Sequence, residues 1–188
     1  MNERANDIVV RVIRALDDAS IPHMLVGSLS SNSYGIERST QDADFVIELG
    51  ERSIGPVALA LRPEIQIDNQ ISFESVTLTS RYQAQHVASG FGIEFFLLAD
   101  EPFHRERFSR RRPVQFGPVR AFLPTAEDVV VQKLRWYVKV KRSKDIDDAR
   151  NVIAVQQGTL DLGYIRSWCD RHQSRELFES LLVETTGL

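Results

Sequence analysis

The chain has 188 residues, of which 43% are hydrophobic and 26% are charged. This length suits one domain, or a domain with a helical appendage, and the composition excludes a disordered or low-complexity protein. The formal net charge of -3 argues against a protein that coats nucleic acid indiscriminately. A single cysteine, Cys169, cannot form an internal disulfide, so we expect a reducing, cytoplasmic location. The absence of a long apolar run predicts no membrane span.

The first two thirds of the chain mix helix and strand signals. Apolar residues at helical spacing predict a helix over 7–19, and short apolar runs predict a strand over 24–26 and a second strand over 42–49. The other predicted elements are short helices over 29–34 and 54–61, and strands over 65–67, 82–87, 93–98 and 119–123. Residues 69–80 fit helix and strand equally well.

After Pro124 the pattern becomes helical. Thr125 is a suitable N-cap for a helix whose first turn holds Glu127 and Asp128 and which ends near residue 141. Three further helices are predicted over 145–155, 160–171 and 174–185. The expected fold class is therefore α/β (α+β), with a mixed sheet flanked by helices over residues 1–123 and a helical subdomain over 124–188 that packs on it.

A glycine–serine pair separates the first predicted strand from the short helix that follows. Gly27 would let an anionic group approach the backbone closely, and the free amides at a helix start, next to the Ser28 hydroxyl, donate to phosphate. Such a pair taken alone is usually a simple turn.

Two aspartates, Asp42 and Asp44, open the second predicted strand. Side chains two residues apart on a strand point to the same side, and paired carboxylates are ligands that Mg²⁺ prefers. An isolated Asp-x-Asp is more often a solvated strand end, but Phe45, Val46 and Ile47 place these acids at the mouth of a buried strand.

A third acid, Glu94, lies inside the apolar run Ile93–Leu98. A carboxylate there is costly unless it is paired, bound to metal or turned to water. A salt bridge to an arginine is one alternative, and a metal site shared with Asp42 and Asp44 is the interpretation we favour.

These features occur in a recognisable order. Gly27-Ser28, the stretch Arg38-Ser39-Thr40-Gln41-Asp42-Ala43-Asp44, a later strand acid, Lys133-Leu134-Arg135 and Lys144-Asp145-x-x-Asp148 together resemble the DNA polymerase beta-type nucleotidyltransferase superfamily. The similarity is greatest to small bacterial members, which include AbiEii-like and MenT-like toxins and minimal nucleotidyltransferases. It extends from about Val26 to Asp148.

The resemblance implies that a nucleoside monophosphate is moved from a nucleoside triphosphate, such as ATP, to a hydroxyl acceptor. Asp42, Asp44 and Glu94 would hold two Mg²⁺ ions and perform the catalysis. The residues implied on the nucleotide side are Gly27, Ser28, Arg38, Thr40, Lys133 and Asp148. The acceptor would be an RNA end (for example tRNA), a protein or a small molecule, and a toxin of this kind would have an antitoxin partner.

One departure supports an alternative function. Most relatives of this branch carry Asp where this chain has Glu94, and the longer side chain would bind a metal differently. A catalytically weak or inactive module that binds nucleotide or a partner on the same fold is the alternative. An arginine cluster at positions 105, 107, 110, 111 and 112 is a further candidate for guiding triphosphate or RNA, although such runs are mostly solvated.

Overall fold

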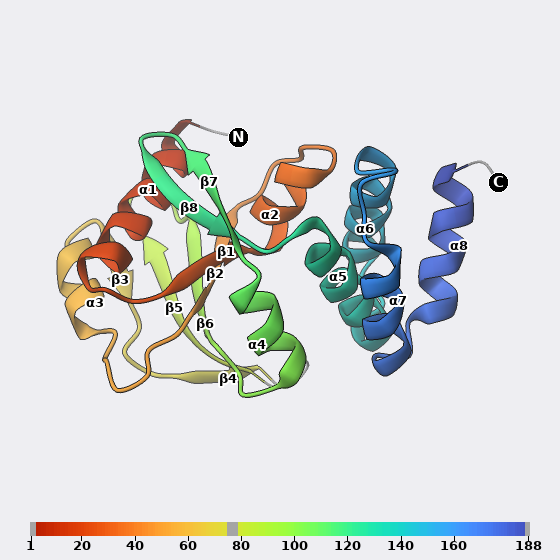
Figure 1. Cartoon of the computed structure of the whole chain (residues 1–188). Helices are drawn as coiled ribbons and strands as arrows, with labels where there is room; N and C mark the ends of the chain where they lie inside the picture. The colour runs from red at the N-terminus through yellow and green to blue at the C-terminus, as the bar shows by residue number, and fades with distance from the viewer. Residues whose placement is uncertain (1–2, 75–78, 187–188) are drawn as a thin grey trace. The chain divides into compact units, whose positions relative to one another are not determined.

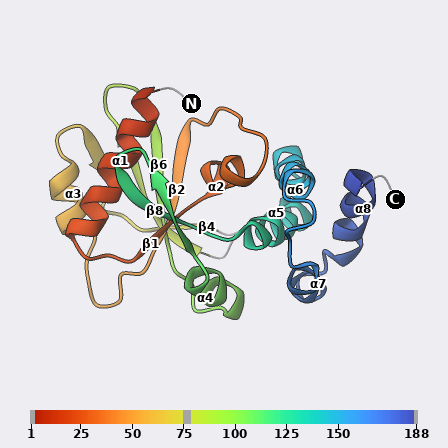
Figure 2. The same cartoon turned by 45° about the horizontal axis from the view of Figure 1, so that its top comes forward.

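The computed structural model describes residues 3–74 and 79–186, which form two compact units. The first unit is drawn from residues 1–29 and 39–123, and the second from residues 30–38 and 124–188. Helix α2 (Gly27–Tyr34) begins in the first unit and ends in the second. Figures 1 and 2 show both units in two views.

A mixed six-stranded sheet forms the centre of the first unit. Its main path runs in the order β1-β2-β6-β5-β3, and β4 pairs with β5. β2 and β6 are parallel, whereas the other pairs are antiparallel. The strands are β1 (His23–Val26), β2 (Asp42–Ile47), β3 (Ile65–Ile67), β4 (Ser72–Glu74), β5 (Thr79–His86) and β6 (Gly92–Leu97). The predicted α/β fold class, with a mixed sheet and a helical C-terminal part, is confirmed.

The two faces of this sheet differ because successive side chains alternate across it. Ala43, Phe45 and Phe95 are buried on one face, and the Phe45 and Phe95 rings stack with their centroids 5.8 Å apart. Helices α1 (Glu3–Asp18) and α3 (Gly55–Leu61) pack against each other and lie over the sheet in both views (Figures 1 and 2). Burial of this face fixes the orientation of the polar residues that alternate with it.

The opposite face is only partly covered. Met24, Val26 and Val46 form a small apolar cluster with Phe108 of helix α4 (Pro102–Ser109). The sequence pattern did not predict α4, nor strand β7 (Arg112–Phe116), which pairs with β8 (Val119–Leu123) as a hairpin. The polar ends of β2 and β6 lie beyond this apolar cluster on the same face.

Four helices dominate the second unit: α5 (Ala126–Val140), α6 (Ser143–Val155), α7 (Leu162–Arg171) and α8 (Arg175–Thr186). The predicted cap is confirmed, since the Thr125 side chain accepts a hydrogen bond from the Asp128 amide. Among the described residues, no helix combines the length and apolar character needed to cross a bilayer.

Residues 30–38 belong to the helical unit because they are hydrogen-bonded to it. The Tyr34 hydroxyl donates to the Pro124 carbonyl (2.9 Å), and the Gln156 amide donates to the Tyr34 carbonyl (2.9 Å). Gly35 lies against the backbone of α6, where a Cβ atom would be 3.2 Å from the Val152 nitrogen. This segment is therefore held on α6 before the chain returns to the sheet.

Candidate functional site

Polar side chains form two rows across the uncovered part of the sheet. The strand register places Gln66, Gln85, Gly92 and Asp42 in one row, from β3 through β5 and β6 to β2. The next row on the same face contains Gln83, Glu94, Asp44 and Val26, from β5 to β1. The structure thus brings the three predicted acids onto two adjacent parallel strands.

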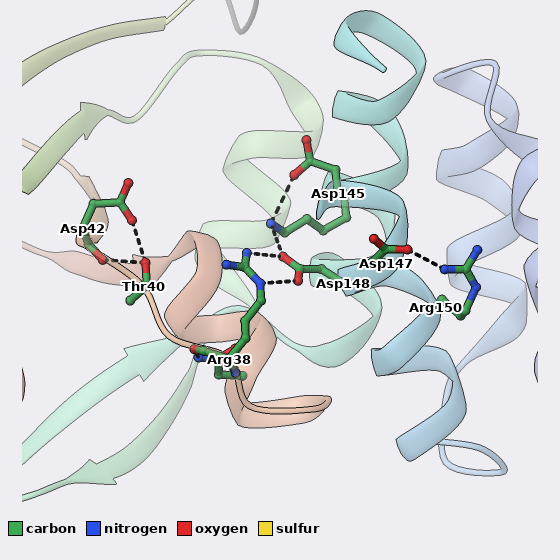
Figure 3. Close-up of polar contacts among 9 residues, drawn as sticks. Arg38, Thr40, Asp42, Asp145, Asp147, Asp148 and Arg150 are labelled. Atoms are coloured by element: carbon green, nitrogen blue, oxygen red, sulfur yellow. Dashed lines mark hydrogen bonds and ion pairs between the residues drawn. The ribbon is translucent and has the colours of Figure 1, made fainter. Parts of the chain in front are cut away.

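Asp42 and Asp44 lie on the same side of β2, as strand alternation predicts. Ala43 between them is only 1% exposed and points into the core, whereas Asp42 is exposed and Asp44 is half-buried. The Thr40 hydroxyl donates to the Asp42 carboxylate (Oγ1 to Oδ1, 2.7 Å), and Figure 3 shows these two side chains turned toward each other. Thr40 therefore orients the first acid.

The Asp44 carboxylate lies directly against the backbone of Gly27. A Cβ atom built on Gly27 would be 1.9 Å from Asp44 Oδ2, which only a residue without a side chain avoids. Gly27 also has a φ of +63°, in the left-handed region that favours glycine. The glycine–serine pair and the second aspartate, 17 positions apart along the chain, consequently meet at the start of α2.

Glu94 is the direct neighbour of Asp44 in the parallel register, but its carboxylate has other partners. Arg81 Nη1 is 3.0 Å from Glu94 Oε2, and the Gln83 amide donates to Oε1 (3.4 Å). The Arg81 guanidinium also lies over the Phe96 ring, 5.7 Å from its centroid. The salt-bridge alternative for Glu94 is thus the one that the structure contains.

A divalent cation fits this donor set only in part. Asp42 and Asp44 offer two carboxylates on one side of one strand, a pairing suited to Mg²⁺. In the described part of the chain, however, no group of three or more His, Cys, Asp or Glu side chains is arranged to hold a metal. Glu94 would have to leave Arg81 to complete the predicted three-acid set.

Three other predicted residues form a buried ion cluster in the helical unit. Lys133, which is 4% exposed, contacts Asp145 (3.2 Å) and Asp148 (2.7 Å). Arg38 binds Asp148 through two hydrogen bonds, of 2.9 Å from Nε and 3.0 Å from Nη2, and Figure 3 shows this pairing. Arg142 pairs with Asp145 at 2.8 Å. The lysine and both aspartates are almost inaccessible to water, whereas the Arg38 and Arg142 side chains are 35% and 41% exposed.

This cluster changes the interpretation of Lys133. A solvated lysine is the usual case, but here both the lysine and its two aspartates are almost fully buried. Its predicted contact with a triphosphate would require it to leave two carboxylates. Asp148 holds Lys133 and Arg38, whereas Asp145 holds Lys133 and Arg142.

The pKa of Asp148 reflects this environment. Burial alone would raise the pKa of its carboxyl, but hydrogen bonds from Arg38 and Lys133, and the charges of both, outweigh burial and hold it below its ordinary value. Asp148 is therefore a fixed anion at neutral pH.

Several side chains of the arginine cluster make contacts inside the first unit. Arg105 pairs with Glu48 (2.6 Å), Arg107 is 6% exposed, and the Arg111 guanidinium lies 4.1 Å from the Phe108 ring centroid. At least these three side chains have intramolecular contacts, which leaves fewer of them for RNA or triphosphate than the sequence indicated.

The polar residues of β5 that lie beside the acids were not among the predicted site residues. Arg81, Gln83 and Gln85 alternate with Tyr82 and Ala84 along β5. That alternation was visible in the sequence, but only the pairing of β5 with β6 shows that these polar side chains share a face with Glu94.

Comparisons with solved structures give a consistent result for the fold. The antibiotic-resistance factor ANT(2'')-Ia matches in its solution structure with a TM-score of 0.65 and 12% identity, over 96% of this chain and 97% of that one. Its crystal structure in complex with adenylyl-2''-tobramycin matches with a TM-score of 0.63 and 13% identity, over 92% and 99%. An antigenic nucleotidyltransferase-like protein from Paracoccidioides brasiliensis gives 0.53 and 17%, over 93% and 91%.

No protein-family model matches the sequence, and a search of curated proteins finds no match. At these low identities the structural similarity establishes the fold: the chain has a nucleotidyltransferase-like fold.

The approach of Gly27 to Asp44 can be tested by Gly27→Ala. The methyl group would overlap the Asp44 carboxylate, and left-handed backbone costs a residue with a side chain roughly 1–2 kcal/mol in addition. Gly50→Ala is the matched control in the same unit, since its φ is +57° and the nearest atom to the new Cβ is the flexible Arg52 side chain at 3.9 Å. We expect urea unfolding to show a clearly larger loss for Gly27→Ala, and equal losses would contradict the close contact.

The ion cluster can be tested by Asp148→Asn. Removing this carboxylate leaves Lys133 short of one partner and Arg38 without its bidentate partner, so we expect a loss of about 3 kcal/mol in the free energy of unfolding. Asp147→Asn on the same helix is the control: its side chain is exposed and pairs with Arg150, and we expect a change within about 0.5 kcal/mol. A similar, small effect of both substitutions would show that the cluster does not stabilise the unit.

The same variant should alter the pH dependence of stability. Because the pKa of Asp148 is lower in the folded than in the unfolded chain, its pairing contributes fully above the ordinary carboxyl pKa of about 4. That contribution is lost as the pH falls through the lowered folded value. Unfolding curves between pH 7 and pH 3 should therefore show the difference between the parent and Asp148→Asn shrinking below about pH 4, and a constant difference would contradict the lowered pKa.

Proposed function

We propose that this protein is a nucleotidyltransferase that moves a nucleoside monophosphate from a nucleoside triphosphate to a hydroxyl acceptor. The observation that carries the proposal is the meeting of the Asp44 carboxylate with Gly27 at the start of α2, beside Asp42 on the same strand face. The nucleotidyltransferase-like fold supports it, because ANT(2'')-Ia, which was crystallised with adenylyl-2''-tobramycin, and a nucleotidyltransferase-like protein both match almost the whole chain.

The residues around Gly27 suit the triphosphate. The amides in the first turn of α2 point along the helix axis, where the positive end of the helix dipole favours anions. Ser28, which is 8% exposed, adds a hydroxyl at this position. We assign this turn to binding of the terminal phosphates.

Asp42 and Asp44 would hold magnesium, which when bound offsets phosphate charge and makes the acceptor hydroxyl more acidic. Thr40 keeps the Asp42 carboxylate oriented through its 2.7 Å hydrogen bond. Because Arg81 neutralises Glu94, we assign Glu94 as an ion-pair partner at the edge of this site and leave the divalent cation to the two aspartates.

Asp44→Asn tests the proposal. The amide keeps the size of the carboxylate beside Gly27 but removes its charge, so we expect an unchanged fold and a loss of transfer of at least about a hundredfold. The measurement is incorporation of each labelled triphosphate, with Mg²⁺, into total RNA, protein or a panel of hydroxylated small molecules. Asp100→Asn, whose side chain is 95% exposed, is the control and should behave as the parent. Equal labelling by the parent and Asp44→Asn would refute the assignment.

The Arg81–Glu94 pair favours a second candidate, a nucleotide-binding module with weak or no catalysis. The pair removes the third acid from any metal site in the arrangement seen here. This candidate predicts that the parent binds a triphosphate, that Asp44→Asn changes this affinity, and that neither protein transfers a nucleotide.

A toxin role is supported by the sequence resemblance of Arg38–Asp44 to the AbiEii-like and MenT-like proteins. A toxin role describes the effect of the protein on the cell and leaves the proposed transfer reaction unchanged. Growth arrest on expression of the parent but not of Asp44→Asn would support it.

A further inference from the structure

A hollow of about 710 Å³ adjoins Asp42 and Glu94 on the uncovered face of the sheet. Its lining includes the exposed side chains of Gln66, Gln83 and Gln85, which the register places next to one another on β3 and β5. Asp42 and Glu94 form one wall, and Asp68 follows β3 at the opposite one. All of these residues belong to the first unit.

The charge of this lining distinguishes between classes of ligand. Among the described residues that line the hollow there are three carboxylates, Asp42, Asp68 and Glu94, and no lysine or arginine. Arg81 compensates Glu94, and magnesium is proposed for Asp42, so Asp68 remains as a net negative charge at the far side. An RNA chain is bound through its phosphates by lysine and arginine, and this lining offers neither.

The carboxamide groups of the three glutamines indicate a ligand that carries hydroxyl groups. Each glutamine amide has two N–H donors and a carbonyl acceptor, a combination that matches hydroxyls, which both donate and accept. Within the described residues, Gln85 donates one hydrogen bond to the Gly90 carbonyl (3.2 Å) and Gln83 donates one to Glu94 (3.4 Å). A second N–H and the carbonyl oxygen of each amide remain for a ligand.

Gly92 leaves space in the middle of this surface. It lies between Gln85 and Asp42 in the first polar row, and a Cβ atom there would be 3.6 Å from the Asp42 Cβ. The absence of a side chain at this position opens a path from the glutamines to the carboxylates.

We propose that this hollow is the acceptor subsite, and that it takes a polyhydroxylated small molecule without phosphate groups, either neutral or carrying amines that Asp68 would accept. The inference rests on the proposed transferase function, since it assigns the hollow to the acceptor hydroxyl. It excludes an RNA end as the molecule bound on these glutamines.

The test compares the double variant Gln66→Ala, Gln85→Ala with the control Gln115→Ala. Gln115 is also exposed on a strand and donates to a nearby glycine carbonyl, that of Gly117 at 2.8 Å, but it lies on the β7–β8 hairpin. Calorimetry would measure the affinity of each protein for tobramycin, for trehalose, for a short RNA and, separately, for each triphosphate with Mg²⁺.

We expect the parent and Gln115→Ala to bind at least one of the two saccharides equally, and the double variant to bind it about tenfold or more weakly. The affinity for triphosphate should be the same in all three proteins. The proposal is overturned if neither saccharide binds the parent, if the double variant binds them unchanged, or if it loses affinity for the RNA. Failure of the transferase proposal is a different result: no triphosphate binds the parent, or Asp44→Asn transfers normally.

Discussion

The contact between Asp44 and Gly27 is the constraint on which the site depends. Two antiparallel strands, β1 and β2, place Val26 opposite Asp44, so the residue that follows Val26 must turn beside the carboxylate. Only glycine satisfies both the positive φ and the lack of space at this point. The chain direction at Gly27 decides where helix α2 starts, and therefore where the backbone amides of its first turn lie. One backbone–side-chain contact thus positions both the acid and the α2 amides that we propose as phosphate donors.

The buried ion cluster acts on a different part of the chain. Asp148 holds Arg38, and Arg38 is the last residue of the segment that belongs to the helical unit. Asn32 supports the same segment, because its amide donates to the Arg38 carbonyl (2.7 Å) and its oxygen accepts from the Arg38 amide (3.2 Å). Thr40 and Asp42 follow two and four residues later in the sequence. Lys133 and Asp148 therefore have an evident structural task, which is to hold Arg38 and the end of this segment within the helical unit.

The sequence was informative wherever a local rule decides the structure. The alternation around Ala43 predicted that Asp42 and Asp44 share a side, and the N-cap chemistry of Thr125 predicted the start of α5. It was not informative about partners from other elements. The resemblance places Lys133 on the nucleotide side, and nothing local reveals that Asp145 and Asp148 surround it after folding. Helix α4 was missed because its sequence, with arginines on several sides, has little helical periodicity, although Phe103 and Phe108 bury it.

Glu94 stands where most members of the resembled branch carry Asp, and its longer side chain has a structural consequence. Arg81 is opposite Phe96 in the register, not opposite Glu94, so the two charged residues are diagonal neighbours on β5 and β6. Diagonal neighbours lie further apart than direct ones and are reached only by long side chains. The extra methylene of glutamate, relative to aspartate, extends the carboxylate toward that diagonal position, where it meets the guanidinium at 3.0 Å. The resulting pair neutralises the Glu94 carboxylate, so the residue that departs from the resemblance is also the one that sets the charge at this edge of the hollow.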